Sequence, residues 1–196
     1  MRKSTIERKT AETQVYIALD LDGEGKVDIE TGIGFFDHML THIGKHSFMN
    51  LEVKVKGDLY IDGHHTIEDT GIVLGQAIKA ALGDKTGIER YGDRIVPMDE
   101  ALILCALDLS GRPYLDIDTP FTSERVGSFE TQMVEEFFRA VAVRAGMNLH
   151  IQILRGKNDH HIIEGMCKAF AKALAQAVGY NPRIQGVLST KGMLEV

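Results

Sequence analysis

Two copies of an H-H-x-x-E pattern are the residues of this chain with the clearest chemical potential. They are His64, His65 and Glu68, and His160, His161 and Glu164. On a helix the first histidine and the glutamate of each copy share a face, whereas adjacent histidines diverge by about 100°. Imidazole nitrogens and carboxylate oxygens are metal ligands, so the spacing predicts two metal sites. The alternative is a single metal site, in which the second histidine does not bind the metal but lies just outside the ligands.

Each predicted site needs ligands from another segment of the chain or from another subunit. The candidates are His38 in GFFDHML and its repeat counterpart Glu136 in MVEEFF, because each lies about one helix and one strand upstream of the histidine pair in its own half. Such a donor set suits Mn²⁺, Fe²⁺ or Zn²⁺ better than Ca²⁺ or Mg²⁺, and the sequence does not choose among the three. His42 and His46 follow on the helical face of His38 and either line the site or face solvent.

The elements that must position these residues occur twice. The segment ALDLDGEGKVDIET at 18–31 parallels ALDLSGRPYLDIDT at 106–119 with an offset of 88, and the segments at 64–83 and 160–179 correspond with an offset of 96. The second copy has an insertion around 119–135. This internal duplication predicts an α+β fold of two similar halves.

Each half is expected to run strand, strand, helix, strand, helix. The segments VYIALDL, ILCALDL and LEVKVKG have the aliphatic content or strict alternation that is typical of strands. We therefore expect a mostly antiparallel sheet with helices on one face in each half. The half-repeats are residues 1–90 and 91–196, packed as one compact unit. Residues 83–100 are expected to form the loop between them.

The most regular helical patterns follow the two histidine pairs. Apolar residues recur there at spacings of three and four, with many alanines between them. Asp62 and Asp159 are the expected N-caps of these helices, and Gly83 and Gly179 are expected just past their C-terminal ends.

The composition of the chain argues against two classes of binding partner, nucleic acids and membranes. The chain has 22 basic and 28 acidic residues and a formal net charge of −6, whereas general affinity for nucleic acid needs a basic face, so no nucleic-acid partner is expected. No segment approaches the roughly 18 apolar residues of a membrane helix or has the form of a signal peptide. No membrane partner and a cytoplasmic location are therefore expected. Cys105 and Cys167 lie in apolar stretches and are expected to be reduced core thiols.

Several segments together carry a family resemblance. They are RKTAETQ, GFFDHML, DGHHTIEDTGIVLGQAI, ERYG, NDHHIIEGMCKAFAKAL and the terminal STKG. Along its whole length the chain resembles the imidazoleglycerol-phosphate dehydratase family of histidine biosynthesis. The resemblance implies a ribosomal-protein-S5 domain 2-like fold and a hydro-lyase that converts D-erythro-imidazole-glycerol phosphate to imidazole acetol phosphate and water. It also implies two Mn²⁺ ions per active site and trimers that associate into a cubic 24-mer shell, with sites between subunits.

The resemblance also implies roles for particular residues, by position in the motifs. The implied metal ligands are His38, His64, His65, Glu68, Glu136, His160, His161 and Glu164. The implied substrate- and phosphate-binding residues are Glu12, His42, Arg90, Arg112, Lys168, Ser189 and Lys191. The implied acid–base residues are Glu12, Glu164, His46 and Asp99. Many family members carry histidine where this chain has Glu136, and a carboxylate suits Mn²⁺ equally well.

The implied chemistry starts at the imidazole ring of the substrate. Two metal ions bound to the ring nitrogens would lower the pKa of the ring as Lewis acids, and the ring could then expel the adjacent hydroxyl through a diazafulvene-like intermediate. An acid–base group must take the C2 proton and protonate the leaving hydroxyl, and the resemblance points to Glu12. The division of roles among Glu12, Glu164, His46 and Asp99 stays open.

Two other functions use the same residues. A dinuclear metallohydrolase would use the ligands to activate water, and phosphatase activity without ketone formation would favour it. A metal-storing or structural shell protein would keep the metal and the oligomer but would not need Arg90, Arg112 or Lys191. Alanine at these basic positions, if it left every measurable property intact, would favour that function.

Overall fold

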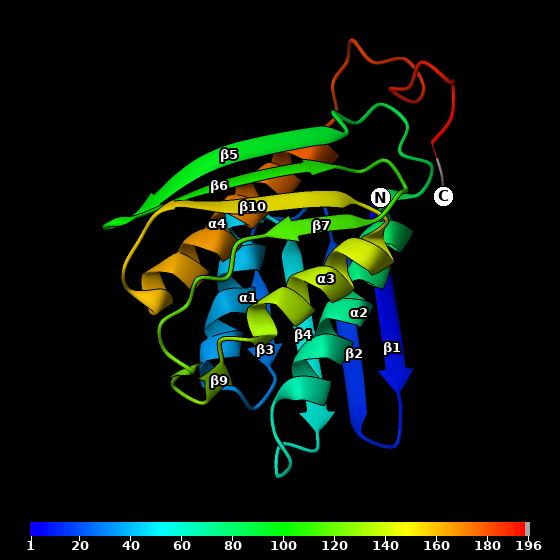
Figure 1. Cartoon of the computed structure of the whole chain (residues 1–196). Helices are drawn as coiled ribbons and strands as arrows, with labels where there is room; N and C mark the ends of the chain where they lie inside the picture. Colours follow the sequence, from blue (N-terminus) through cyan, green and yellow to red (C-terminus); the bar gives the residue numbers. More distant parts are fainter. Residues whose placement is uncertain (195–196) are drawn as a thin grey trace.

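The computed structural model describes residues 1–194, and the first half of the chain forms one four-stranded sheet (Figure 1). Its strands, in the sheet order β1-β2-β4-β3, are β1 (Lys3–Lys9), β2 (Thr13–Asp20), β4 (Asn50–Gly57) and β3 (Val27–Glu30). β1, β2 and β4 pair antiparallel, and β3 runs parallel to β4. Buried residues alternate along β2, so one face of this sheet belongs to the core.

A second sheet repeats this arrangement. Its strands, in the sheet order β5-β6-β10-β7, are β5 (Tyr91–Met98), β6 (Ala101–Asp108), β10 (Asn148–Arg155) and β7 (Tyr114–Ile117). Again only the last pair is parallel. The predicted α+β fold of two similar, mostly antiparallel halves is thereby confirmed. The insertion of the second half holds a small antiparallel pair, β8 (Arg125–Val126) and β9 (Phe129–Glu130).

The helices lie between the two sheets (Figure 1). They are α1 (Gly34–Ser47), α2 (His64–Leu82), α3 (Met133–Ala145) and α4 (Asp159–Val178). α2 packs on β1 and β2, and α4 packs on β5 and β6. In each half, a helix therefore covers one face of the sheet. The helices also pack across the halves, α1 against α4 and α2 against α3. The two halves therefore share one hydrophobic core, and the division at residue 90 stays a prediction.

Glycines on α2 allow α3 to approach closely. A Cβ at Gly71 would lie 2.8 Å from the backbone oxygen of Phe137, and a Cβ at Gly75 would lie 2.7 Å from the backbone oxygen of Val141. Both distances are shorter than a Cβ can tolerate against backbone, so only glycine permits this contact. The close approach fixes the position of α3 relative to the first histidine pair.

Helix α4 begins differently from the prediction. The N-cap is Asn158, whose side chain accepts a hydrogen bond from the backbone N–H of His160 at 2.9 Å. Asp159 is the first helical residue, so its prediction as N-cap is wrong. Its carboxylate instead accepts hydrogen bonds from Thr122 and from the backbone N–H of Ser123, which tie the insertion to the helix.

Helix α2 begins after Gly63, which is its N-cap. Asp62, the predicted N-cap, lies one residue earlier and accepts a hydrogen bond from the backbone N–H of His64 at 2.8 Å. Gly83 and Gly179 follow the last residues of α2 and α4, as predicted. No helix in the described part of the chain is long and apolar enough to cross a membrane.

The prediction that residues 83–100 form a loop is wrong, because β5 lies within them. Each half consequently starts with one strand more than predicted. Apart from the β8–β9 pair of the insertion, each half runs strand, strand, strand, helix, strand, helix. The additional strands, β1 and β5, are edge strands whose sequences lack alternating apolar residues. Polar residues and a proline such as Pro97 are tolerated at an edge, so these strands lack the apolar pattern by which strands are recognised.

Candidate metal centre and active site

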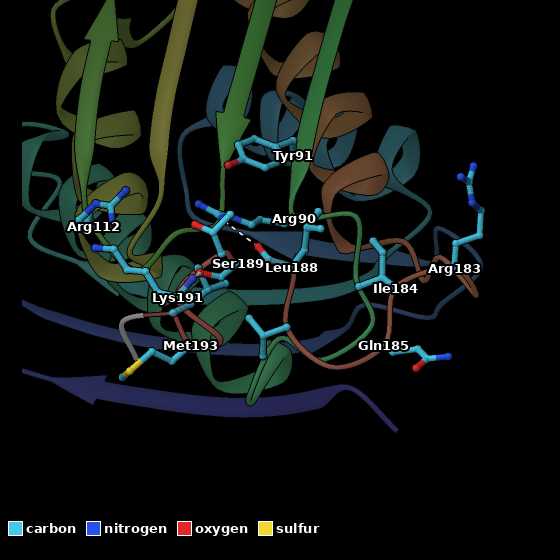
Figure 2. Close-up of a pocket in the computed structure, with 13 residues that line it drawn as sticks. Arg90, Tyr91, Arg112, Arg183, Ile184, Gln185, Leu188, Ser189, Lys191 and Met193 are labelled. Atoms are coloured by element: carbon cyan, nitrogen blue, oxygen red, sulfur yellow. Dashed lines mark hydrogen bonds between the residues drawn. The ribbon is translucent and has the colours of Figure 1, made fainter.

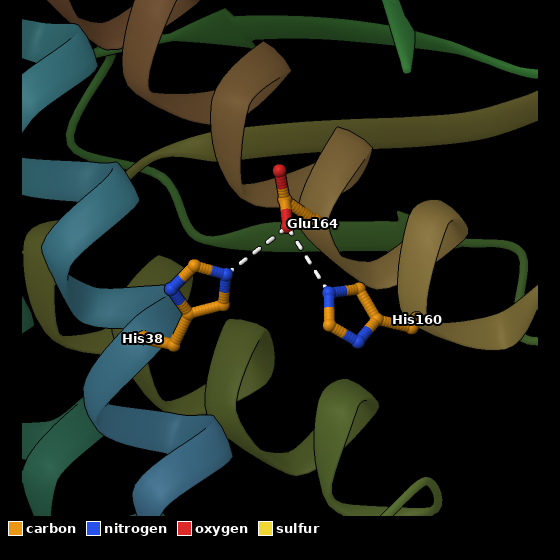
Figure 3. A group of neighbouring side chains, drawn as sticks. All are labelled: His38, His160 and Glu164. Atoms are coloured by element: carbon orange, nitrogen blue, oxygen red, sulfur yellow. Dashed lines mark hydrogen bonds and ion pairs between the residues drawn. The ribbon is translucent and has the colours of Figure 1, made fainter. Parts of the chain in front are cut away.

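Two histidines and a glutamate from the two halves meet between α1 and α4 (Figure 3). Nε2 of His38 lies 3.1 Å from Oε2 of Glu164, and Nε2 of His160 lies 3.2 Å from the same oxygen. One ligand atom from each of the three residues lies within 4.8 Å of the others. The Glu164 side chain is 7% exposed, whereas those of His38 and His160 are 46% and 42% exposed. The group therefore combines a buried carboxylate with an open side.

This histidine–glutamate cluster joins residues of both halves. Because α1 packs against α4, His38 of the first half lies beside His160 and Glu164 of the second. Correspondingly, Glu136 lies on α3, which packs against α2, the helix that carries His64. Sequence spacing gives a position within a half but does not say which half provides the neighbouring helix.

The donor set of this cluster fits a divalent transition-metal ion. Two imidazole nitrogens and one carboxylate oxygen suit Mn²⁺, Fe²⁺ or Zn²⁺. Burial raises the pKa of Glu164, but the hydrogen bond and positive charge of Lys168 and the hydrogen bond from His38 outweigh it, and the pKa is lowered to about 2. The carboxylate is therefore ionised at neutral pH, as a metal ligand must be.

Three further side chains extend the cluster. Nζ of Lys168 lies 2.6 Å from Oε1 of Glu164, and Nε2 of His42 lies 3.4 Å from the same oxygen. The ring of His46 stacks on that of His42 with centroids 5.4 Å apart. Burial lowers the pKa of His42 to about 4 and also lowers the pKa of His46. Both rings are therefore neutral near pH 7, and His42 contacts the cluster rather than facing solvent.

The first H-H-x-x-E copy is more open. Nε2 of His64 lies 3.7 Å from Oε2 of Glu68, which is longer than a hydrogen bond. Glu136 and His64 line the same cavity, together with residues of the insertion. Within residues 1–194, the cluster at Glu164 is the one group of three with the spacing of metal ligands.

The second histidine of the first copy turns away from its neighbour. The ring planes of His64 and His65 lie 72° apart. Nδ1 of His65 lies 3.0 Å from an oxygen of Asp58, and its Nε2 lies 3.8 Å from Oε1 of Glu12. The hydrogen bond from His65 to Asp58 raises the pKa of His65.

The second copy repeats this geometry with other residues. The ring planes of His160 and His161 lie 84° apart. Nδ1 of His161 lies 2.7 Å from Oε2 of Glu100, and its Nε2 lies 3.6 Å from Oδ2 of Asp99. Glu12 and Asp99, two of the predicted acid–base residues, thus occupy corresponding places opposite Nε2 of a second histidine.

A separate pocket gathers four of the predicted phosphate-binding residues (Figure 2). They are Arg90, Arg112, Ser189 and Lys191, and most of the other residues in the pocket come from the C-terminal segment. Lys168 and His42 are not in this pocket but beside Glu164, and Glu12 lies beside His65. Within one described chain, the predicted substrate-binding residues therefore fall into separate groups.

Arg90 shapes this pocket. Its Nε and Nη2 donate hydrogen bonds to the two carboxylate oxygens of Asp108 at 2.7 and 3.0 Å, and its Nη1 donates to the backbone oxygen of Leu188 at 2.7 Å. The contact with Leu188 links the C-terminal segment to the residue before β5. Asp108 balances the charge of Arg90, whereas Arg112 and Lys191 have no ion-pair partner within the described residues.

Sequence reasoning missed three residues of these groups. Glu100 could have been found from the sequence, because it follows Glu12 by the repeat offset of 88 residues. Asp58 has no counterpart at a repeat offset, and its contact with His65 depends on the loop before α2. Arg183 lines the pocket from the irregular C-terminal segment, where no spacing pattern applies.

Comparisons with known proteins show the family of this chain. The family model described as imidazoleglycerol-phosphate dehydratase matches residues 31–174. The chain is 60% identical to the imidazoleglycerol-phosphate dehydratase of Lachnoclostridium phytofermentans, over 99% of each chain, and 60% identical to that of Acetivibrio thermocellus, over 98% of this chain and 99% of the relative.

Solved structures are similar over nearly the whole chain. The crystal structure of imidazoleglycerol-phosphate dehydratase from Staphylococcus aureus has a TM-score of 0.83 and 41% identity, covering 91% of this chain and 99% of that one. The structure of the enzyme from Pyrococcus furiosus, in complex with (S)-C348, has a TM-score of 0.83 and 33% identity, covering 96% and 100%.

Fold, site and relatives together define a hydro-lyase, an enzyme that removes water from its substrate. Its histidine–glutamate cluster is a possible metal site, as a metal-dependent family requires. More particularly, the chain belongs to the imidazoleglycerol-phosphate dehydratase family. It is therefore an enzyme of histidine biosynthesis that acts on a phosphorylated imidazole.

Proposed function

We propose that the chain converts D-erythro-imidazole-glycerol phosphate to imidazole acetol phosphate and water, with two Mn²⁺ ions per active site. The cluster of His38, His160 and Glu164 is the observation that carries this proposal. An ionised carboxylate, two exposed imidazoles and a nearby ammonium group form a place where a cation and an anionic, nitrogen-rich substrate can both bind.

One ion is proposed at His38, His160 and Glu164, and a second at the corresponding residues of the other copy, His64, Glu68 and Glu136. The common cavity of His64 and Glu136 and the internal repeat support the second site. His65 and His161 complete the ligand sets. The bound ions supply Lewis acidity, which lowers the pKa of the substrate's imidazole ring.

The proton transfers are assigned to this chain's carboxylates. Loss of the ring N–H proton makes the ring an electron donor that can expel the neighbouring hydroxyl group, which must be protonated as it leaves. Removal of the C2 proton and return of a proton to the ring nitrogen then give an enol, which tautomerises to the ketone product. Glu12 is favoured for moving these protons because it is 54% exposed and its Oε1 lies beside a second histidine. Asp99 occupies the corresponding place beside His161 and is the second choice. Glu164 is less suited, because Lys168 and the histidines hold it ionised.

Phosphate binding is proposed for the pocket of Arg90, Arg112, Ser189 and Lys191. Two cations without ion-pair partners in the described chain and a hydroxyl group suit a phosphate dianion. Lys168 would contact the substrate from the side of the histidine–glutamate cluster.

The active site is proposed to combine residues of several copies of the chain. The pocket and the cluster are lined by different residues, and the second histidines point away from the first. Trimers that associate into a 24-mer shell would bring the pocket of one copy to the histidines of another. Because such shared ligands couple metal binding to assembly, removal of metal is expected to shrink the particle, as measured by light scattering. An unchanged size would contradict shared ligands.

The direct test of function uses chelated protein, before and after Mn²⁺ is restored. The expected result is formation of imidazole acetol phosphate only with Mn²⁺. Release of inorganic phosphate without ketone product would indicate a metallohydrolase instead. Full activity of the chelated protein would overturn the metal dependence but leave the family assignment intact.

A further inference from the structure

We infer that Asp58 and Glu100 are positioning residues, which hold His65 and His161 so that each ring offers Nε2 to a metal ion. The inference rests on the proposed function, because it takes the second histidine of each motif as a metal ligand. Neither carboxylate belongs to the histidine motifs, and each reaches its histidine from outside the helix that carries it.

Asp58 is well placed for this role. It lies just after β4 with a side chain only 9% exposed, and its two oxygens lie 3.0 and 3.2 Å from Nδ1 of His65. Within the described residues, His65 is the side-chain partner of this carboxylate. A nearly buried carboxylate is costly unless it is paired, so the pairing with Nδ1 is strongly favoured.

Glu100 contacts Nδ1 of His161 from another part of the fold. It lies between β5 and β6, and its Oε2 lies 2.7 Å from Nδ1 of His161. Its Oε1 accepts hydrogen bonds from the backbone N–H groups of Lys157 and Asn158 at 3.2 and 2.8 Å. These two bonds fix the carboxylate against the start of α4, so the His161 ring is held as well.

The two contacts come from positions that do not correspond in the duplicated fold. Asp58 precedes the helix of its histidine by a short loop, whereas Glu100 comes from the turn that corresponds to the turn of Glu12. The duplication alone therefore does not explain why both rings are held at Nδ1. A common requirement for metal binding explains both contacts. A hydrogen bond from Nδ1–H to a carboxylate fixes the tautomer of the ring and leaves the lone pair on Nε2 free to bind a metal ion. That nitrogen faces Glu12 in one copy and Asp99 in the other.

His150 supplies a matched control. Its Nδ1 lies 3.6 Å from Oδ2 of Asp116, beyond hydrogen-bond distance, on the exposed face of the second sheet. The contact has the same chemical groups as the two inferred ones, but His150 has no proposed role in metal binding. Asp116→Asn is therefore expected to change neither metal affinity nor the spectroscopic signal of bound metal.

The test compares Asp58→Asn, Glu100→Gln and Asp116→Asn in the full chain. Affinity for Mn²⁺ is measured by electron paramagnetic resonance of the free ion. With Cu²⁺ as probe, electron spin-echo modulation then reports on the ring nitrogen that does not bind the metal. We expect the first two variants to lose about 10- to 100-fold in Mn²⁺ affinity, with an altered signal from that nitrogen.

Unfolding of the metal-free variants is measured in parallel, because a purely structural role would change stability without changing the nitrogen signal. Wild-type affinity and an unaltered signal in Asp58→Asn and Glu100→Gln would overturn the inference while leaving the metal sites in place. Failure of the wild-type chain to bind Mn²⁺ or Cu²⁺ would overturn both the inference and the proposed metal sites.

Discussion

Nε2 of His38 lies 3.1 Å from Oε2 of Glu164, although the two residues are 126 positions apart in the chain. The contact exists because α1 of the first half packs against α4 of the second. A chain with two similar halves thus forms its candidate metal site from both of them. Neither half alone contains the three donors of the histidine–glutamate cluster.

Glu12→Gln tests the proposed proton transfer. The amide keeps the size of the side chain but cannot exchange a proton, so we expect binding of substrate and Mn²⁺ to stay near wild type while kcat falls about 100- to 10,000-fold. Steady-state kinetics and Mn²⁺ titration measure the two quantities. Glu7→Gln, a change at an exposed residue of β1, is the control. Normal turnover by Glu12→Gln would remove Glu12 from this role.

Arg112→Ala tests the proposed phosphate pocket. The Arg112 guanidinium has no ion-pair partner within residues 1–194, so its removal should leave stability nearly unchanged. Loss of a charge-assisted hydrogen bond costs about 1.5–3 kcal/mol, and we expect KM to rise roughly 10- to 150-fold. Arg139→Ala, on the exposed side of α3, is the control. An unchanged KM in Arg112→Ala would exclude a contact with the substrate.

Gly71→Ala tests the helix packing that positions α3. The added Cβ would lie 2.8 Å from the backbone oxygen of Phe137, so the helices must move apart, at a cost of about 1–3 kcal/mol in unfolding free energy. Gly34→Ala is the matched control, because a Cβ there has no atom within 4 Å. Urea denaturation of both variants measures the difference. Equal stability of the two would contradict the close contact of α2 and α3.

Asp159→Asn tests the link between the insertion and α4. Burial raises the pKa of Asp159, but hydrogen bonds from Ser123 and Thr122 outweigh it and lower the pKa below 3.8. A lowered pKa in the folded state means that the carboxylate stabilises the fold above pH 3.8 and that this contribution is lost as the pH falls further.

The measurement is urea denaturation of metal-free protein at pH 7 and at pH 3. We expect Asp159→Asn to be about 1–3 kcal/mol less stable than wild type at pH 7, and the difference to shrink at pH 3. A difference that stayed constant between the two values of pH would show that the ionised carboxylate does not stabilise the fold.

The secondary structure could be predicted from the sequence where apolar residues recur with a strong periodicity. The strands of LEVKVKG and ALILCALD and the helices after the histidine pairs follow that periodicity. The edge strands β1 and β5 were missed because their sequences, KSTIERK and YGDRIVPM, lack alternating apolar residues, which an edge position tolerates.

The residue types of the candidate site could be predicted from the sequence, but the contacts between its residues could not. The spacing of His160 and Glu164 on one helical face was visible, and the two residues lie 3.2 Å apart. The choice of His38 as their neighbour depends on which helices pack together, and the role of Glu100 depends on a turn in another sheet. Such tertiary contacts leave no local spacing in the sequence.

The most direct test of the central claim is anomalous X-ray diffraction at the manganese absorption edge, from crystals grown with Mn²⁺. We expect a manganese peak within bonding distance of Nε2 of His38, Nε2 of His160 and a carboxylate oxygen of Glu164. A peak bound by histidines of one half alone, or no peak beside Glu164, would contradict a metal site built from both halves.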